Sequence, residues 1–149
     1  MKTGIPDEIY NSMDIIDSRD IIERIDYLVQ LQDDFQEDNE LEDYPGYEES
    51  EEDSKWYEWD ESEEGFELNK LQELTNEVQD YAEDWENGCI LIRDNYFSEY
   101  AEELVKDIGD LPKDIPSYLY NNIDWDGVAE DIQQDYTEVD FDGVSYWVR

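Results

Sequence analysis

Acidic residues alternate with apolar ones near the end of the chain, in the run EVDFDG at 138–143. Acids at every second position followed by a glycine are typical of the first half of a calcium-binding loop. With Glu138 at the first loop position, Asp140 and Asp142 fall on the third and fifth positions, and Gly143 on the sixth. Such side chains could supply oxygen ligands to a calcium ion.

The second half of the calcium template is missing. Its twelfth position requires a glutamate that binds the metal with both oxygens, but the residue here is Arg149, and the ninth position is Tyr146. Apolar alternation resumes after the Asp142–Gly143 pair, and Asp-Gly between two alternating runs predicts a type I′ hairpin turn. We therefore expect a β-hairpin with one face in the core and its acids in water, about 7 Å apart along the strand.

Other residue types that could perform catalysis are scarce. The chain has no histidine, the usual general base and metal ligand, and one cysteine, Cys89. Cys89 lies in the apolar run CILI, so we expect it to be buried, and no internal disulfide can form. The sequence has no glycine-rich phosphate loop and no CxxC or HExxH motif. We expect a protein that is not an enzyme and that uses no cofactor or metal.

Net charge dominates the composition of the 149 residues. The chain has 46 Asp and Glu against 9 Lys and Arg, for a formal charge of −37. Such a charge excludes direct binding to nucleic acid or an anionic membrane, and it favours a partner with a large basic surface. Aromatic residues make up 14% of the chain, which argues against a disordered acidic chain. A single thiol, no signal peptide and no apolar span predict a cytoplasmic protein.

Many acids recur three or four residues apart, a spacing that places them in rows on one face of a helix. On the scale of B-DNA, which carries one charge per about 1.7 Å of axis, a charge of −37 matches about 60 Å of duplex, roughly 18 base pairs. An ordered scaffold with this density of acids could occupy a DNA-binding groove. The candidate residues of this surface are Glu73, Glu77, Asp80, Asp84, Glu99, Glu102, Glu103, Asp107, Glu130, Asp131, Asp135, Glu138, Asp140 and Asp142.

Apolar periodicity and cap residues predict the elements that carry these acids. The fold class is α+β, with a helical hairpin-like arm at 1–87 followed by a small helix-rich α/β domain at 88–149 that ends in the β-hairpin. The predicted helices span 18–36, 66–86, 94–108 and 124–134, with a short helical piece at SYLYNN, 117–122. The side chains expected to face inward on the second and third helices are Leu71, Leu74, Val78, Tyr81 and Trp85, then Phe97, Tyr100 or Ala101, Leu104 and Ile108.

Half of the residues at 36–65 are acidic, and a block of like charge favours a solvated linker. An alternative is left open by the aromatic residues interleaved with those acids, which could pin the segment to the fold or to a partner. These aromatics are Tyr44, Tyr47, Trp56, Tyr57 and Trp59.

Two C-terminal segments resemble the ArdA-type antirestriction proteins of plasmids, conjugative transposons and phages. The segments are DNYFSEYAEELVKDIG (94–109) and IPSYLYNNIDWDGVAEDIQQDYTEVDFDGVSYWVR (115–149). They share with that family an acidic helix with a YF…YA…DIG pattern, a proline-led segment, a further acidic helix and an acidic hairpin. The resemblance covers about a third of the chain. The stretches DSRDIIERIDYL and DW..GC.LIRD more weakly resemble smaller phage-encoded relatives.

This resemblance implies a DNA mimic, because such proteins form elongated acidic dimers that occupy the DNA groove of type I restriction–modification enzymes. The chain departs from the family pattern at three places. We expect a helix and an acidic segment where the family has an N-terminal β-rich domain, Ile123 stands in place of an aromatic residue, and Glu130 stands in place of an arginine. The resemblance places the self-association segment at Ile115, Pro116, Tyr118, Leu119, Ile123, Asp124 and Trp125.

We therefore predict a DNA mimic that inhibits a host DNA-binding defence enzyme, with a type I restriction–modification complex as the favoured target. The alternative is an acidic adaptor that docks on a basic partner, such as a CRISPR effector, through Leu71, Leu74 and Val78 of its helical arm. A third hypothesis is weak buffering of divalent cations by the segment 36–65.

Overall fold

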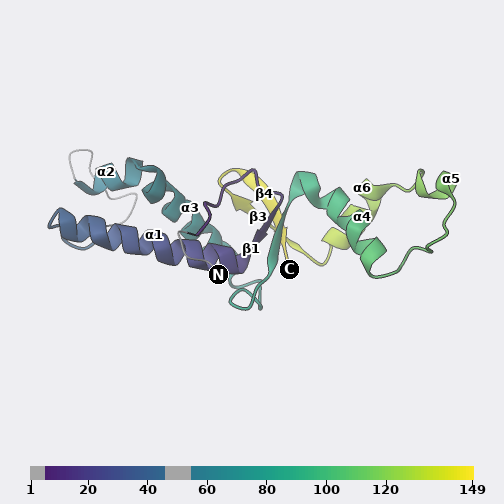
Figure 1. Cartoon of the computed structure of the whole chain (residues 1–149), viewed down its shortest axis with the longest axis horizontal. Helices are drawn as coiled ribbons and strands as arrows, with labels where there is room; N and C mark the ends of the chain where they lie inside the picture. Colours follow the sequence, from purple (N-terminus) through teal and green to yellow (C-terminus); the bar gives the residue numbers. More distant parts are fainter. Residues whose placement is uncertain (1–5, 46–54) are drawn as a thin grey trace.

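The computed structural model describes residues 6–45 and 55–149. The molecule is elongated, with helices at both ends and a β-sheet between them (Figure 1). The elements are β1 (Ile15–Asp17), α1 (Ser18–Asp38), α2 (Lys55–Glu61), α3 (Glu63–Val78), β2 (Ile90–Arg93), the 3₁₀ helix η2 (Asp94–Tyr96), α4 (Phe97–Asp107), α5 (Ser117–Tyr120), α6 (Trp125–Gln133), β3 (Thr137–Phe141) and β4 (Val144–Val148).

The four strands form one antiparallel sheet in the order β1-β2-β4-β3. The short N-terminal strand β1 pairs with β2, and β2 pairs with β4 of the C-terminal hairpin. The sheet thus joins β1, which lies in the predicted arm at 1–87, to β2, β3 and β4, which lie in the predicted domain at 88–149. This mixture of helices with one antiparallel sheet confirms the α+β fold class.

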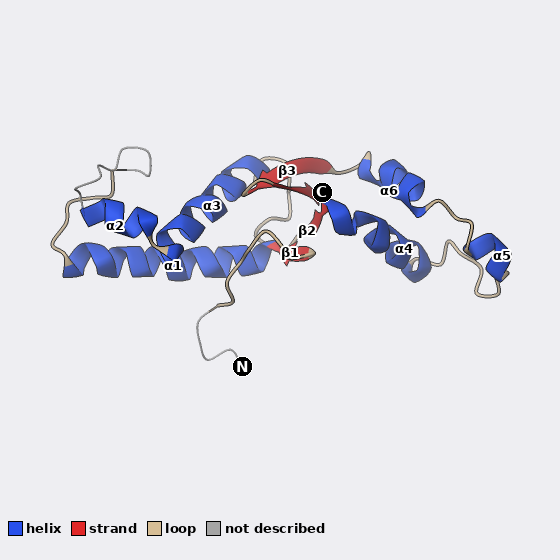
Figure 2. Ribbon diagram, turned by 90° about the horizontal axis from the view of Figure 1, so that it is seen from above, coloured by secondary structure: helices blue, strands red, loops and turns tan. Residues whose placement is uncertain are grey.

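One face of the sheet packs against α1 and α3 to form the larger core. Ile16, Leu91 and Val148 lie opposite one another on adjacent strands, and all three are fully buried. The helix α1 begins where the side chain of Asp17 accepts a hydrogen bond from the N–H of Arg19, a typical N-terminal cap. In Figure 2, α3 starts close to α1 and separates from it toward the sheet, where it ends near β3.

The opposite face of the sheet supports a smaller core beneath α4 and α6. Ile92 of β2 is buried there with Phe97, Ala101 and Ala129. Trp147 pairs with Ile92 in the strand register and packs against the same cluster. The sheet is therefore a central layer with a helical group on each face.

The predicted second helix is too long at its C-terminal end, because α3 stops at Val78 and not near 86. Turns follow, in which the N–H groups of Tyr81 and Ala82 bond to the carbonyl of Val78. They return Ala82 and Trp85 to the core and leave Tyr81 60% exposed, so the inward position predicted for Tyr81 is wrong. The chain must turn here to enter β2, and this requirement ends the helix.

The inward position predicted for Ile108 is also wrong, because its side chain is 60% exposed. Helix α4 ends at Asp107, and Gly109 follows with a φ of 80° that suits glycine. The smaller core contains Phe97 and Ala101 from the start and middle of this helix. Helical spacing placed Ile108 on the inner face, but the core does not extend to the last turn.

Aromatic residues pin the described part of the acidic segment 36–65 to the fold. Trp56 and Trp59 of α2 are buried, and their rings lie 5.6 and 5.7 Å from that of Phe35 on α1. The ring of Tyr44 lies 5.0 Å from that of Trp56 in an edge-on arrangement. The prediction of a solvated linker is therefore wrong for Tyr44, Trp56 and Trp59. Tyr47 lies outside the described residues.

The C-terminal hairpin has the predicted turn and the predicted faces. Asp142 and Gly143 have φ angles of 49° and 83°, the positive values that a type I′ turn requires at both central positions. Val139 and Phe141 are buried, while the acids of the strand point to solvent. Within residues 6–45 and 55–149, no cluster of acidic or cysteine side chains could hold a metal ion.

Candidate acidic interaction surface

The fourteen acids of the candidate surface are displayed to solvent almost without exception. Thirteen are exposed, and Glu102 alone is half-buried. The acids on regular elements are Glu73 and Glu77 on α3, Glu99, Glu102, Glu103 and Asp107 on α4, Glu130 and Asp131 on α6, and Glu138 and Asp140 on β3. The others, Asp80, Asp84, Asp135 and Asp142, lie in the turns that follow α3, α6 and β3.

The acidic row predicted along the second helix is interrupted. Glu73 and Glu77 share α3, but Asp80 and Asp84 follow the end of the helix at Val78. The four carboxylates are exposed without sharing one helix face. Glu73 also forms an ion pair with Lys70, in which the nitrogen lies 3.6 Å from the oxygen.

The helices α4 and α6, which carry two groups of these acids, lie side by side in both views (Figures 1 and 2). Glu102 differs from its neighbours because it accepts hydrogen bonds from the Tyr120 hydroxyl and from the Lys106 ammonium. These two hydrogen bonds lower the pKa of Glu102 below its ordinary value, and the bond from Tyr120 has the larger effect. Glu102 therefore fastens the chain around α5 to α4 and is less available to a partner.

A further acidic row on α1 was missed in the sequence reasoning. Glu23, Asp26, Asp33 and Glu37 are exposed and spaced three, seven and four residues apart, which keeps them on one side of the helix. The same spacing rule applied to 18–38 would have found them. With this row, exposed acids extend from the tip of the arm to the opposite end of the molecule.

The few basic side chains are largely neutralised within the fold. Among the residues that the structure describes, six of them form ion pairs with carboxylates. The pair between Arg24 and Glu67 is buried, with both side chains only 9% exposed and a nitrogen–oxygen distance of 2.8 Å. The pKa of Arg24 is raised, chiefly by its hydrogen bonds with Glu67. The acidic surface is therefore little interrupted by free positive charge.

The residues matched to a self-association segment lie on and beside α5, at the far end of the molecule from the arm (Figure 1). Tyr118 is 71% exposed and Leu119 is 51% exposed, so two large apolar side chains that are adjacent in sequence both face solvent. Pro116 is exposed as well, while Ile115, Ile123 and Trp125 are half-buried.

The three apolar side chains proposed for the alternative, adaptor function are not accessible to a partner. Leu71, Leu74 and Val78 are each no more than 1% exposed, because they pack in the larger core. An adaptor that docks through these three side chains would first have to open that core.

No helix in the described ranges is long and apolar enough to cross a membrane.

A family model described as "Antirestriction protein (ArdA)" matches residues 5–144. The match extends well beyond 94–149, where the sequence resemblance is clearest, and it includes the helical arm. No curated protein and no solved structure matched the chain. Because the family model covers nearly the whole chain, this protein belongs to the ArdA family of antirestriction proteins, inhibitors that act on restriction enzymes.

Proposed function

We propose that this antirestriction protein is a DNA mimic that occupies the DNA-binding groove of a type I restriction–modification complex. The observation that carries the proposal is the distribution of exposed carboxylates along an elongated, ordered scaffold, from α1 to α6. A groove built to neutralise phosphates presents lysine and arginine side chains at regular intervals. Rows of carboxylates on a folded scaffold offer such a groove the same charge without a cleavable backbone.

The dimensions of the scaffold agree with this role. The 21 residues of α1 span about 32 Å at the ~1.5 Å rise of an α-helix, which equals about nine base pairs of duplex. Helix α1 and the pair α4 and α6 lie at opposite ends of the molecule, with the strand β3 between them (Figure 2), and all of these elements carry exposed acids. The protein thus presents charge over a length that a local acidic patch could not cover.

The acids act collectively, so the test neutralises a row and not a single residue. The variant Asp26→Asn/Asp33→Asn/Glu37→Gln removes three charges from α1, and Asp26→Glu/Asp33→Glu/Glu37→Asp keeps them as a matched control. If each exposed pair contributes about 0.5 kcal/mol, the neutral variant should inhibit a purified type I enzyme about tenfold less well. The control should inhibit like the parent.

Salt and competitor DNA provide the second arm of this test. Inhibition through surface charge should weaken steeply as ionic strength rises, and duplex DNA should displace the protein from the enzyme. A folded neutral variant that inhibits as well as the parent would overturn the mimicry proposal. Strong binding to a different groove-containing defence enzyme, such as a CRISPR effector, with no binding to type I complexes would overturn the proposed target.

We also propose that the protein self-associates through the surface around α5. The exposed side chains of Tyr118 and Leu119 at the end of the molecule support an end-to-end dimer, which would roughly double the length of the charged scaffold. The variant Tyr118→Ala/Leu119→Ala should sediment as a monomer at concentrations where the parent is a dimer. Tyr81→Ala, at another exposed aromatic, is the control and should leave the dimer intact. A parent that is monomeric throughout contradicts this proposal.

A further inference from the structure

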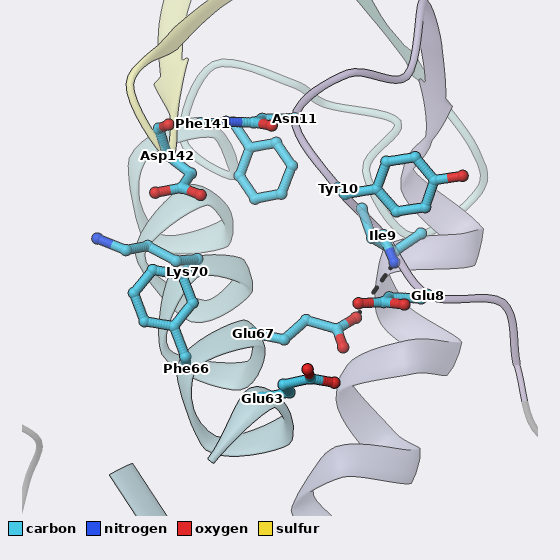
Figure 3. Close-up of a pocket in the computed structure, with 10 residues that line it drawn as sticks. All are labelled: Glu8, Ile9, Tyr10, Asn11, Glu63, Phe66, Glu67, Lys70, Phe141 and Asp142. Atoms are coloured by element: carbon cyan, nitrogen blue, oxygen red, sulfur yellow. Dashed lines mark hydrogen bonds between the residues drawn. The ribbon is translucent and has the colours of Figure 1, made fainter. Parts of the chain in front are cut away.

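A pocket of about 270 Å³ opens on the arm between the N-terminal segment, α3 and the tip of the hairpin (Figure 3). Three aromatic rings line it, those of Tyr10, Phe66 and Phe141. Tyr10 is 52% exposed and Phe66 is 41% exposed, so both present ring surface to solvent. This volume lies below the roughly 300–1,000 Å³ of sites for drug-sized ligands, which suits the pocket to a single side chain.

The buried ion pair holds the wall of this pocket in place. The carboxylate of Glu67 on α3 accepts two hydrogen bonds from Arg24 and a third from the N–H of Ile9, which lies 3.2 Å away. Arg24 also donates to the carbonyl of Pro6. On the other side, the amide of Asn11 donates to the carbonyl of Asp142 at 3.0 Å. Hydrogen bonds between segments far apart in sequence therefore hold both sides of the pocket in place.

Uncompensated negative charge surrounds the aromatic lining. Glu8, Glu63 and Asp142 contribute side chains to the pocket, and none of the three forms an ion pair within the described ranges of the chain. Figure 3 shows the carboxylates of Glu8 and Glu63 on the same side of the pocket as Glu67. An incoming cation would meet these carboxylates without displacing an existing partner.

The resident cation Lys70 is engaged elsewhere. Its ammonium pairs with Glu73, outside the pocket, and lies 5.3 Å from the centre of the Phe66 ring. In Figure 3 the end of this side chain points away from Glu8 and Glu63. Lys70 therefore leaves these glutamates free, and its position shows that the ring of Phe66 accepts a cation at its surface.

We propose that this pocket binds an arginine side chain of the inhibited enzyme, an inference that rests on the proposed function and names one contact within it. A guanidinium group is planar and weakly hydrated, so it can stack on an aromatic ring while it donates hydrogen bonds to carboxylates at its edge. The pocket offers rings and carboxylates together. A lysine ammonium would use the charge but not the flat aromatic surface, so arginine is the preferred occupant.

This contact differs in kind from the contacts made by the acidic rows. The rows are exposed and contribute collectively, whereas an arginine in the pocket is partly desolvated and positioned by rings from three separate segments. A single anchored residue fixes the register of a long, charge-based interface that could otherwise slide. The pocket therefore contributes specificity that charge density alone does not supply.

The first experiment uses nuclear magnetic resonance of the full chain with N-acetyl-arginine amide as the probe. We expect weak, saturable binding with shifts concentrated at residues 8–11, 63–70 and 141–142, and little response to the neutral citrulline analogue. Phe66→Ala should lower the affinity about two- to fivefold, the factor for one exposed cation–π contact. Lys70→Gln should raise the affinity, because it removes a like charge. Tyr81→Ala, outside the pocket, is the matched control and should change nothing.

Shifts spread evenly over the acidic surface, or an affinity unchanged in Phe66→Ala, would overturn the pocket proposal. A second experiment measures inhibition of the type I enzyme by Phe66→Ala and Tyr81→Ala at several salt concentrations. The loss in Phe66→Ala should persist at high salt relative to the control. If the parent itself fails to inhibit, the proposed function fails, while the probe experiment still decides whether the pocket recognises arginine.

Discussion

At one end of the molecule, α1 and α3 pack on the sheet around a core in which eighteen of the described side chains are buried. At the other end, α4 and α6 enclose a core of four described side chains. Both ends display rows of exposed acids, whose mutual repulsion opposes compaction. The arm offsets this repulsion with apolar burial and a buried ion pair. The other end has much less buried surface with which to do so.

At the end formed by α4, α5 and α6, polar and aromatic contacts compensate in part for the small apolar core. Phe97 is surrounded by the rings of Tyr100, Tyr136 and Trp147, at centroid distances of 5.5, 5.3 and 6.2 Å. Trp147 also donates a hydrogen bond to Asp94. Regions with few buried apolar side chains open at lower free energy, so we expect this end to fluctuate more than the arm.

The largest effect is expected at the buried ion pair of the arm. Arg24→Met leaves the carboxylate of Glu67 buried without its partner and should lower the free energy of unfolding by about 3–5 kcal/mol. Denaturant titration measures the change. The double variant Arg24→Met/Glu67→Leu removes both charges and should recover most of the loss. A single variant as stable as the parent would show that the arm does not depend on this pair.

Truncating one side chain in each core tests the contrast between the two ends directly. Leu74→Ala should destabilise the whole molecule by about 2–5 kcal/mol, since Leu74 is 1% exposed in the larger core. Phe97→Ala should instead accelerate hydrogen exchange mainly in α4 and α6 and leave α1 and α3 protected. Uniform acceleration in both variants would mean that the two cores unfold as one cooperative unit.

A smaller effect is expected at Tyr146, whose hydroxyl donates to the carbonyl of Met13. Burial raises the pKa of Tyr146 to about 12, so the stability gained from its neutral form is present below about pH 10 and lost as the pH rises toward 12. Tyr146→Phe should cost about 1 kcal/mol at neutral pH. It should also reduce the alkaline loss of stability, monitored by circular dichroism. An alkaline unfolding curve identical to that of the parent would contradict this assignment.

Burial also raises the pKa of Tyr136 to about 12. The Tyr146→Phe variant should therefore still lose some stability at alkaline pH through Tyr136.

The smallest effect is expected at the exposed pair of Lys55 and Glu58 on α2, in which both side chains are more than half exposed. Lys55→Gln should change the free energy of unfolding by no more than about 0.5 kcal/mol, because solvent screens such a pair. Comparison with Arg24→Met in the same denaturant titration separates buried from exposed ion pairs. A loss comparable to that of Arg24→Met would show that α2 contributes far more to the arm than its exposure indicates.

Local pattern was sufficient for much of the fold. The helix over 18–36, the hairpin at Asp142–Gly143 and the helix that begins near Asp94 were all predicted from cap residues, turn residues and apolar spacing. These signals depend on neighbours within a few residues, so the sequence carries them directly. The family resemblance was likewise visible in 94–149, and the family model extends it over the arm.

Long-range pairing was not predictable in the same way. The strand β1 has three residues and no alternation of its own, and it exists because β2 offers it a partner. The same limit explains Tyr81 and Ile108, which have the spacing of core residues but lie beyond the ends of their helices. Arg24 and Glu67 are 43 residues apart, and nothing local distinguishes them from the other charged residues.

The sequence by itself determined the extreme charge, the spacing of the acids and the local elements that display them, because composition and periodicity are properties of the chain alone. The tertiary structure decided which acids share a surface, which apolar side chains remain exposed at α5, and that Tyr10, Phe66 and Phe141 meet around one pocket. Those results depend on contacts between distant segments. These contacts form only when the whole chain folds, because the segments that bury apolar surface and the Arg24–Glu67 pair are far apart in sequence.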